Sequence, residues 1–61
     1  MYYRLWQRIE NDDDLLIEIN DNLRELVESL YCLIQNCKEN NIEYKDKYYI
    51  EDKDFNVIFV S

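Results

Sequence analysis

The order of apolar and polar positions along the chain predicts a strand, a long helix and a hairpin. Residues 2–9 are rich in aromatic side chains and alternate with the two-residue period of a β-strand. Residues 10–13 are polar and predict a turn into the helix. One face of the strand would carry Tyr3, Leu5 and Ile9, and the other would carry Tyr2, Arg4, Trp6 and Arg8.

The longest periodic segment predicts a helix from about residue 13 to about residue 39. Asp12 or Asp13 would cap its first turn, because a carboxylate accepts hydrogen bonds from the free N–H groups there. Asn40 and Asn41 would end it, since asparagine tolerates the left-handed conformation. Apolar residues spaced three and four apart would form its buried face: Leu16, Ile19, Leu23, Leu26, Val27, Leu30, Ile34 and Cys37.

The last third of the chain predicts a hairpin, with strands at residues 44–50 and 55–60 and a turn at 51–54. The last strand is almost wholly apolar, so we expect it to be central in the sheet or covered on both faces. The predicted fold is a single α+β domain over residues 1–61, of order β-α-β-β, with the helix packed across a three-stranded sheet. If the first strand pairs in parallel with a neighbour, the helix would be a right-handed crossover.

Composition and charge restrict the class of partner. Fourteen acidic residues against seven basic ones give a net charge of −7. This charge argues against direct binding of nucleic acid or an anionic membrane, and favours a basic protein as partner. No apolar run is long enough for a signal peptide or a membrane span, so we expect a cytoplasmic protein. A chain of 61 residues builds only a small core, which favours a homodimer or another partner.

The side chains that usually carry catalysis or bind metals are scarce. The chain has no histidine, and it has no glycine for a phosphate-binding loop. The aspartates at 12–14 lack the alternating spacing of a calcium loop. Cys32 and Cys37 would point in different directions on a helix, with Cys37 in the core and Cys32 on the surface. We therefore expect no enzyme, no cofactor and no metal site.

Acidic residues form a stripe along the outer face of the predicted helix. At about 100° per residue they fall within a band about 80° wide and roughly 21 Å long. Repulsion would cost about 0.2–0.5 kcal/mol for each pair of neighbours. The stripe is either a solvated helix face or an anionic ridge that docks into a basic groove as nucleic acid would. Its members are Asp14, Glu18, Asp21, Glu25 and Glu28.

A second candidate surface is the aromatic and basic face of the first strand, with Tyr44, Tyr48 or Tyr49 expected nearby. Tryptophan, tyrosine and arginine are the residue types that anchor protein interfaces. Trp6 could instead cover the sheet or seal a dimer. Stacking on single-stranded nucleic acid would suit these side chains but conflicts with the net charge. The surface consists of Tyr2, Arg4, Trp6 and Arg8.

In size, charge and composition the chain resembles small acidic inhibitors encoded by phages and mobile elements. Such proteins block host nucleases, polymerases or defence complexes, as anti-CRISPR proteins do. The resemblance implies a non-enzymatic inhibitor and assigns no residues. The leading hypothesis, drawn from the stripe itself, is that the acidic residues occupy a basic nucleic-acid-binding surface of a partner, for example of a nuclease complex. The alternative hypothesis is a structural or regulatory subunit, such as an antitoxin-like or assembly partner, that binds through the aromatic strand face and the sheet.

Overall fold

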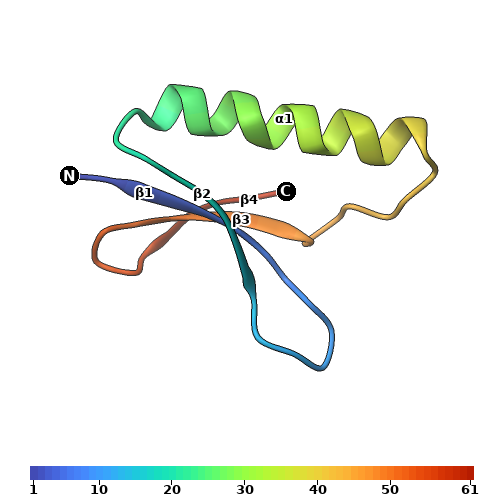
Figure 1. Cartoon of the computed structure of the whole chain (residues 1–61), viewed down its shortest axis with the longest axis horizontal. Helices are drawn as coiled ribbons and strands as arrows, with labels where there is room; N and C mark the ends of the chain where they lie inside the picture. The colour runs from blue at the N-terminus through green and yellow to red at the C-terminus, as the bar shows by residue number, and fades with distance from the viewer.

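The chain forms a four-stranded antiparallel sheet with one helix across one of its faces (Figure 1). The computed structural model describes residues 1–61. The strand order in the sheet is β2-β1-β3-β4, and every neighbouring pair is antiparallel. In chain order the elements are β1 (Tyr3–Gln7), β2 (Leu15–Asn20), α1 (Leu23–Glu39), β3 (Tyr48–Asp52) and β4 (Val57–Val60).

The α+β class with one helix is confirmed, but the predicted three strands and β-α-β-β order are not. The predicted helix is wrong over residues 13–22, where the chain forms β2 and then the connection to α1. The β-branched Ile17 and Ile19 favour a strand. The actual N-cap is Asn22, whose side-chain oxygen accepts from the N–H groups of Arg24 and Glu25 at 3.0 and 3.3 Å.

The end of α1 agrees with the prediction. The helix stops at Glu39, and Asn41 takes the left-handed conformation at a φ of 55°. The N–H of Ile42 then donates to the carbonyl of Cys37 at 2.8 Å, which closes the last turn. Asparagine here occupies the left-handed position that glycine usually takes after a helix, in a chain that has no glycine.

The core lies between α1 and one face of the sheet, which we call the covered face. Leu5 of β1, Ile50 of β3, and Leu26 and Leu30 of α1 are fully buried there. Burial of each such side chain contributes about 1.5–3 kcal/mol before the entropy of ordering is subtracted. The predicted apolar face of the helix is confirmed from Leu23 to Cys37. Leu16 and Ile19, which were expected on the helix, belong to β2 instead.

The two cysteines lie where the sequence placed them, because Cys37 is buried and Cys32 is exposed. Both are free thiols. The helix is neither long nor apolar enough to cross a membrane.

The predicted hairpin at the end of the chain is confirmed as β3 and β4, but the prediction that the last strand is central or covered is wrong. β4 is an edge strand, and Val57, Ile58 and Val60 are exposed. The other edge strand is β2. Each edge strand contains a β-bulge, because Ile17 in β2 and Ile58 in β4 have no residue opposite them in the neighbouring strand.

Candidate functional site: the open face of the sheet

The face of the sheet opposite α1, here called the open face, is covered by no other element of the chain (Figure 1). Side chains that lie directly opposite each other in antiparallel strands share a face. Arg4 is opposite Glu51, and Trp6 is opposite Tyr49. Because the intervening Leu5 lies in the core on the covered face, these four side chains form the centre of the open face.

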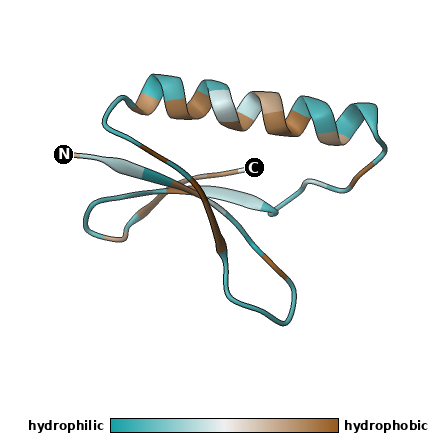
Figure 2. Ribbon diagram, in the orientation of Figure 1, coloured by the Kyte–Doolittle hydropathy of each residue, from teal (hydrophilic) through white to brown (hydrophobic).

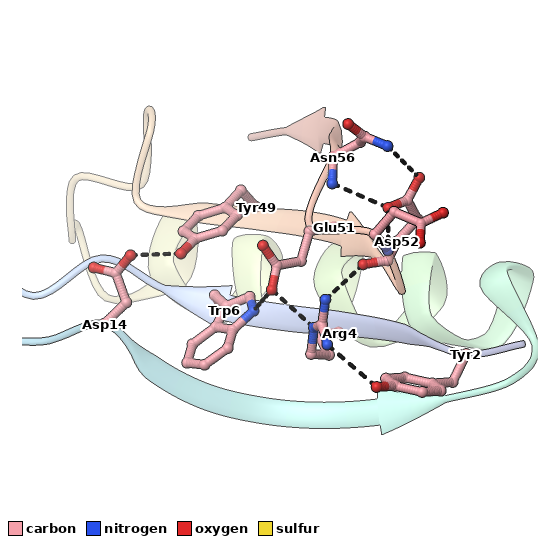
Figure 3. Close-up of polar contacts among 9 residues, drawn as sticks. Tyr2, Arg4, Trp6, Asp14, Tyr49, Glu51, Asp52 and Asn56 are labelled. Atoms are coloured by element: carbon pink, nitrogen blue, oxygen red, sulfur yellow. Dashed lines mark hydrogen bonds and ion pairs between the residues drawn. The ribbon is translucent and has the colours of Figure 1, made fainter.

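A buried ion pair lies at this centre (Figure 3). The guanidinium Nε of Arg4 is 2.8 Å from Oε1 of Glu51, and the two side chains are only 9% and 10% exposed. The indole N–H of Trp6 donates to the same oxygen at 2.6 Å. Arg4 also donates through Nη2 to the backbone carbonyl of Asp52 at 2.6 Å and through Nη1 to the hydroxyl of Tyr2 at 3.4 Å. Both charges are therefore satisfied within the chain.

Aromatic rings surround the ion pair and bring a second arginine to the face. The guanidinium carbon of Arg4 lies 5.3 Å from the ring centre of Tyr2 and 4.3 Å from that of Phe55. Towards the other end of the sheet, Arg8 lies 5.2 Å from the ring centre of Tyr49. The rings of Tyr49 and Trp6 stack at 6.5 Å with an angle of 15° between their planes. Arginine and aromatic side chains thus line the central strands from end to end.

Tyr49 is further held by the connection between β1 and β2. Its hydroxyl donates a hydrogen bond to the carboxylate of Asp14 (Figure 3). Burial and this hydrogen bond raise the pKa of Tyr49 to about 12. The phenol therefore stays protonated at neutral pH and keeps the β1–β2 connection on the open face.

Exposed apolar side chains flank this centre on both sides. In β2, Leu16 lies opposite Trp6 and Ile19 lies opposite Arg4. Figure 2 shows β2 as a strongly hydrophobic strand. On the other side of the sheet, β4 places Val57 opposite Glu51 and Val60 opposite Tyr49. With the two rings near Arg4, six apolar side chains on this face are between 39% and 73% exposed: Tyr2, Leu16, Ile19, Phe55, Val57 and Val60.

Phe55 is the most exposed of the six, and its backbone is strained. Its φ is 65°, in the left-handed region. The other non-glycine residues with positive φ in this chain are asparagine or aspartate, which tolerate that region. For phenylalanine the conformation costs about 1–2 kcal/mol. The turn between β3 and β4 thus bears a conformational cost while presenting an exposed ring.

The acidic stripe is not one helix face, because its residues lie in different elements, although the side-chain amide of Asn20 donates to both Glu18 and Glu25. Asp14 precedes β2 and binds Tyr49 on the open face. Glu18 lies within β2, where its carboxylate accepts a hydrogen bond from the hydroxyl of Ser29 at 2.9 Å. The stripe required one helix through all of these positions, and α1 begins only at Leu23.

Three of the five acids remain exposed near the start of α1. Asp21 lies in the connection before the helix, and Glu25 and Glu28 lie within it. Arg24 approaches Glu28 at 4.0 Å, and both side chains are well exposed. Such a surface pair contributes little to stability.

The structure brings Tyr2, Arg4, Trp6 and Arg8 onto one face, as strand alternation predicted. Among the three tyrosines expected nearby, Tyr49 is the one that stacks on this face. Sequence reasoning missed Glu51 and Phe55, which were placed in a turn and at a strand start, and the apolar residues of β2. Alternating Ile17 and Ile19 followed by the polar segment 20–22 was the signal for that strand.

The structure contains no pocket. It also contains no cluster of three or more histidine, cysteine, aspartate or glutamate side chains that could bind a metal ion. The most distinctive feature of the molecule is therefore a surface: an apolar, aromatic sheet face with an internal ion pair. The chain matches no known family model, no curated protein and no solved structure, so the interpretation of this surface rests on its own geometry.

Proposed function

We propose that the protein is a non-enzymatic protein-binding module, a structural or regulatory subunit, whose contact surface is the open face of the sheet. The observation that carries the proposal is the row of exposed apolar side chains along both edges of this face, around the Arg4–Glu51 pair. A contiguous apolar patch on a small protein is a common sign of an interaction site.

The composition of the open face supports this proposal. Interface centres are rich in tryptophan, tyrosine and arginine, and poor in unpaired charges. Trp6, Tyr49 and Arg4 occupy the middle of the face, and the charge of Arg4 is already neutralised by Glu51. A partner that covers this region does not have to provide a counter-charge, so its burial costs less free energy.

The strain at Phe55 is a second, independent support. Unfavourable backbone conformations persist where the surrounding structure compensates for them, and they occur most often at functional positions. Here the strained residue presents a ring that is 73% exposed. Contact with a partner would explain why an exposed phenylalanine occupies a position whose backbone suits asparagine better.

The proposal is tested by site-specific photo-crosslinking. A photo-reactive phenylalanine analogue is placed at Ile19 on the open face, and in a control protein at Ile42, which lies between α1 and β3. The two isoleucines are similarly exposed, at 54% and 44%. We expect protein adducts from position 19 and none from position 42 after irradiation in cells that naturally produce the protein. No adduct from position 19, or equal adducts from both positions, would contradict the proposal.

A charge-reversal variant distinguishes this function from inhibition by an acidic surface. If the open face is the contact, Ile19→Lys abolishes binding of the crosslinked partner, whereas the double variant Glu25→Lys/Glu28→Lys leaves it unchanged. The opposite result, together with binding that weakens steeply with salt, would instead support docking of the acidic side of α1 into a basic nucleic-acid-binding surface.

A further inference from the structure

We infer that the occupant of the open face is a second copy of this chain, so that two sheets pack face to face and the two α1 helices lie on the outside. The inference rests on the proposed function and names the partner of the same surface. Four properties of the molecule support it: the charge balance of the face, the position of the remaining charge, the available area, and the shape of the sheet edges.

The open face is electrically balanced within one chain. It carries Arg4 and Arg8 together with Glu51 and Asp14, and each of the four makes a contact within the chain. A face whose two positive and two negative groups give no net charge selects poorly for a strongly charged partner. It suits an apolar and aromatic surface, which is what a second copy provides.

The charges of the four groups on this face cancel, so the net charge of −7 lies elsewhere: −4 in the connections, −2 in the strands and −1 on α1. In a face-to-face dimer the sheets would lie about 10 Å apart. Each helix would lie roughly another 10 Å beyond its own sheet, so the two helices would be about 30 Å apart. This separation is several times the screening length of about 8 Å at physiological salt. Each α1 has a net charge of only −1, so repulsion between the two helices opposes such a dimer only weakly.

The area of the face is sufficient for a weak dimer. The six exposed apolar side chains present about 500 Å² if each has a total area of about 150–200 Å². Trp6, Tyr49 and Arg8 are partly exposed and add to this. A specific interface of the smaller kind buries about 600 Å² on each partner. The open face is thus near the lower limit for a specific interface, and we expect a dissociation constant in the micromolar range.

Two copies could instead pair through their edge strands and form one continuous sheet. The edges of this sheet do not favour that arrangement. Both edge strands are interrupted by a bulge, at Ile17 in β2 and at Ile58 in β4, and β4 has only four residues. Bulges twist an edge and disrupt the regular spacing of its free N–H and C=O groups. The second copy is therefore expected on the face of the sheet.

Sedimentation equilibrium of the purified chain tests the inference, over about 1–500 μM to span the expected affinity. We expect the mass to rise from one chain to two. Ile19→Lys and Val60→Lys should each raise the dissociation constant at least about tenfold. Ile42→Lys is the matched control, because Ile42 and Val60 are 44% and 43% exposed and only Val60 lies on the open face. All three substituted side chains are exposed in the single chain, so circular dichroism should show an unchanged fold.

Salt provides a second readout. Association of two acidic chains through an apolar face should strengthen as sodium chloride rises, because salt screens their mutual repulsion. A wild-type chain that stays monomeric over the whole range would overturn the inference, as would equal effects of Ile19→Lys and Ile42→Lys. If a monomeric chain still forms adducts from position 19 with a different protein, the inference that the partner is a second copy is wrong, and the proposed function stands. If position 19 forms no adduct with any protein, the proposed function itself fails.

Discussion

Arg4 and Glu51 form an ion pair that is nearly buried on a sheet face that no second layer covers. Each is nearly buried although no second layer lies over it, because the rings of Tyr2 and Phe55 lie close to the guanidinium and Trp6 donates to the carboxylate. Buried ion pairs gain little net stability over apolar side chains of the same size, yet either charge left alone is costly. The pair therefore acts as a unit.

This coupling predicts the outcome of a double-mutant cycle. Arg4→Met leaves the carboxylate of Glu51 without its cation, and we expect a loss of about 3 kcal/mol in the free energy of unfolding. The double variant Arg4→Met/Glu51→Leu should lose clearly less than the Arg4→Met variant, since no unpaired charge remains. Urea denaturation of the wild type, both single variants and the double variant measures this. Losses that simply add would show that the two charges are independent.

A second prediction at the residue scale concerns the backbone of Phe55. Phe55→Asn relieves a left-handed phenylalanine, worth about 1–2 kcal/mol, and removes a stacking contact with Arg4 worth about 0.5–1 kcal/mol. The free energy of unfolding should thus stay unchanged or rise by up to about 1.5 kcal/mol, while association through the open face weakens. Phe55→Leu is the control, because it keeps the strain and loses the ring, and it should be less stable than the wild type. A large loss of stability in Phe55→Asn would show that the phenylalanine is there for the fold alone.

At the scale of elements, the prediction was right where the apolar pattern fits only one type of secondary structure. It was wrong where the pattern fits both a helix and a strand. The helical spacing from Leu23 to Cys37 and its asparagine stop agree with α1. The apolar residues Leu16 and Ile19 happen to continue the same spacing, so β2 was read as the first turns of the helix. What decided between the two was Asn22, because its cap fixes where the helix can begin.

The apolar run in β4 was misread for a different reason. A strand without polar residues is usually covered on both faces, and the prediction assumed that the chain itself provides both covers. One helix can cover only one face of this sheet. The apolar residues of β4 were therefore a sign of an unoccupied surface rather than of a central position.

The turn between β3 and β4 predicts how stability depends on pH. Hydrogen bonds from the backbone N–H of Asn56, the largest cause, and from its side chain and the N–H of Asp54 lower the pKa of Asp52 below its ordinary 3.8. A carboxyl group with a lowered pKa stabilises the fold above its ordinary pKa, and that contribution is lost as the pH falls through the folded value. We therefore expect the urea midpoint to drop below about pH 4.

Two variants assign this acid sensitivity to the turn. Asp52→Ala should be less stable than the wild type at neutral pH, and the difference between them should shrink as the pH falls below the ordinary 3.8 and through the lowered pKa of Asp52. Asp54→Ala, another exposed acid of the same turn, should retain the full dependence. A parallel pH profile for the wild type and Asp52→Ala would contradict this assignment.

At the scale of the whole molecule, the sequence predicted one side of the candidate site and not the surface as a whole. Alternation in β1 was enough to place Arg4 and Trp6 on a common face. Nothing local shows that β3 lies beside β1, and this pairing is what brings Glu51 and Tyr49 to the same face. The prediction of one acidic helix face failed because β2 and α1 are separate elements, and the structure joins Glu18 and Glu25 through Asn20 instead.

The bulges in β2 and β4 also bear on the behaviour of the protein at high concentration. A chain with two free sheet edges and a largely apolar last strand has the features that promote amyloid-like stacking. An irregular edge cannot template a regular cross-β ladder, and the surplus of acidic groups keeps colliding molecules apart. Solutions of this protein are thus expected to stay clear and free of fibrils where a variant with regular edges would gel.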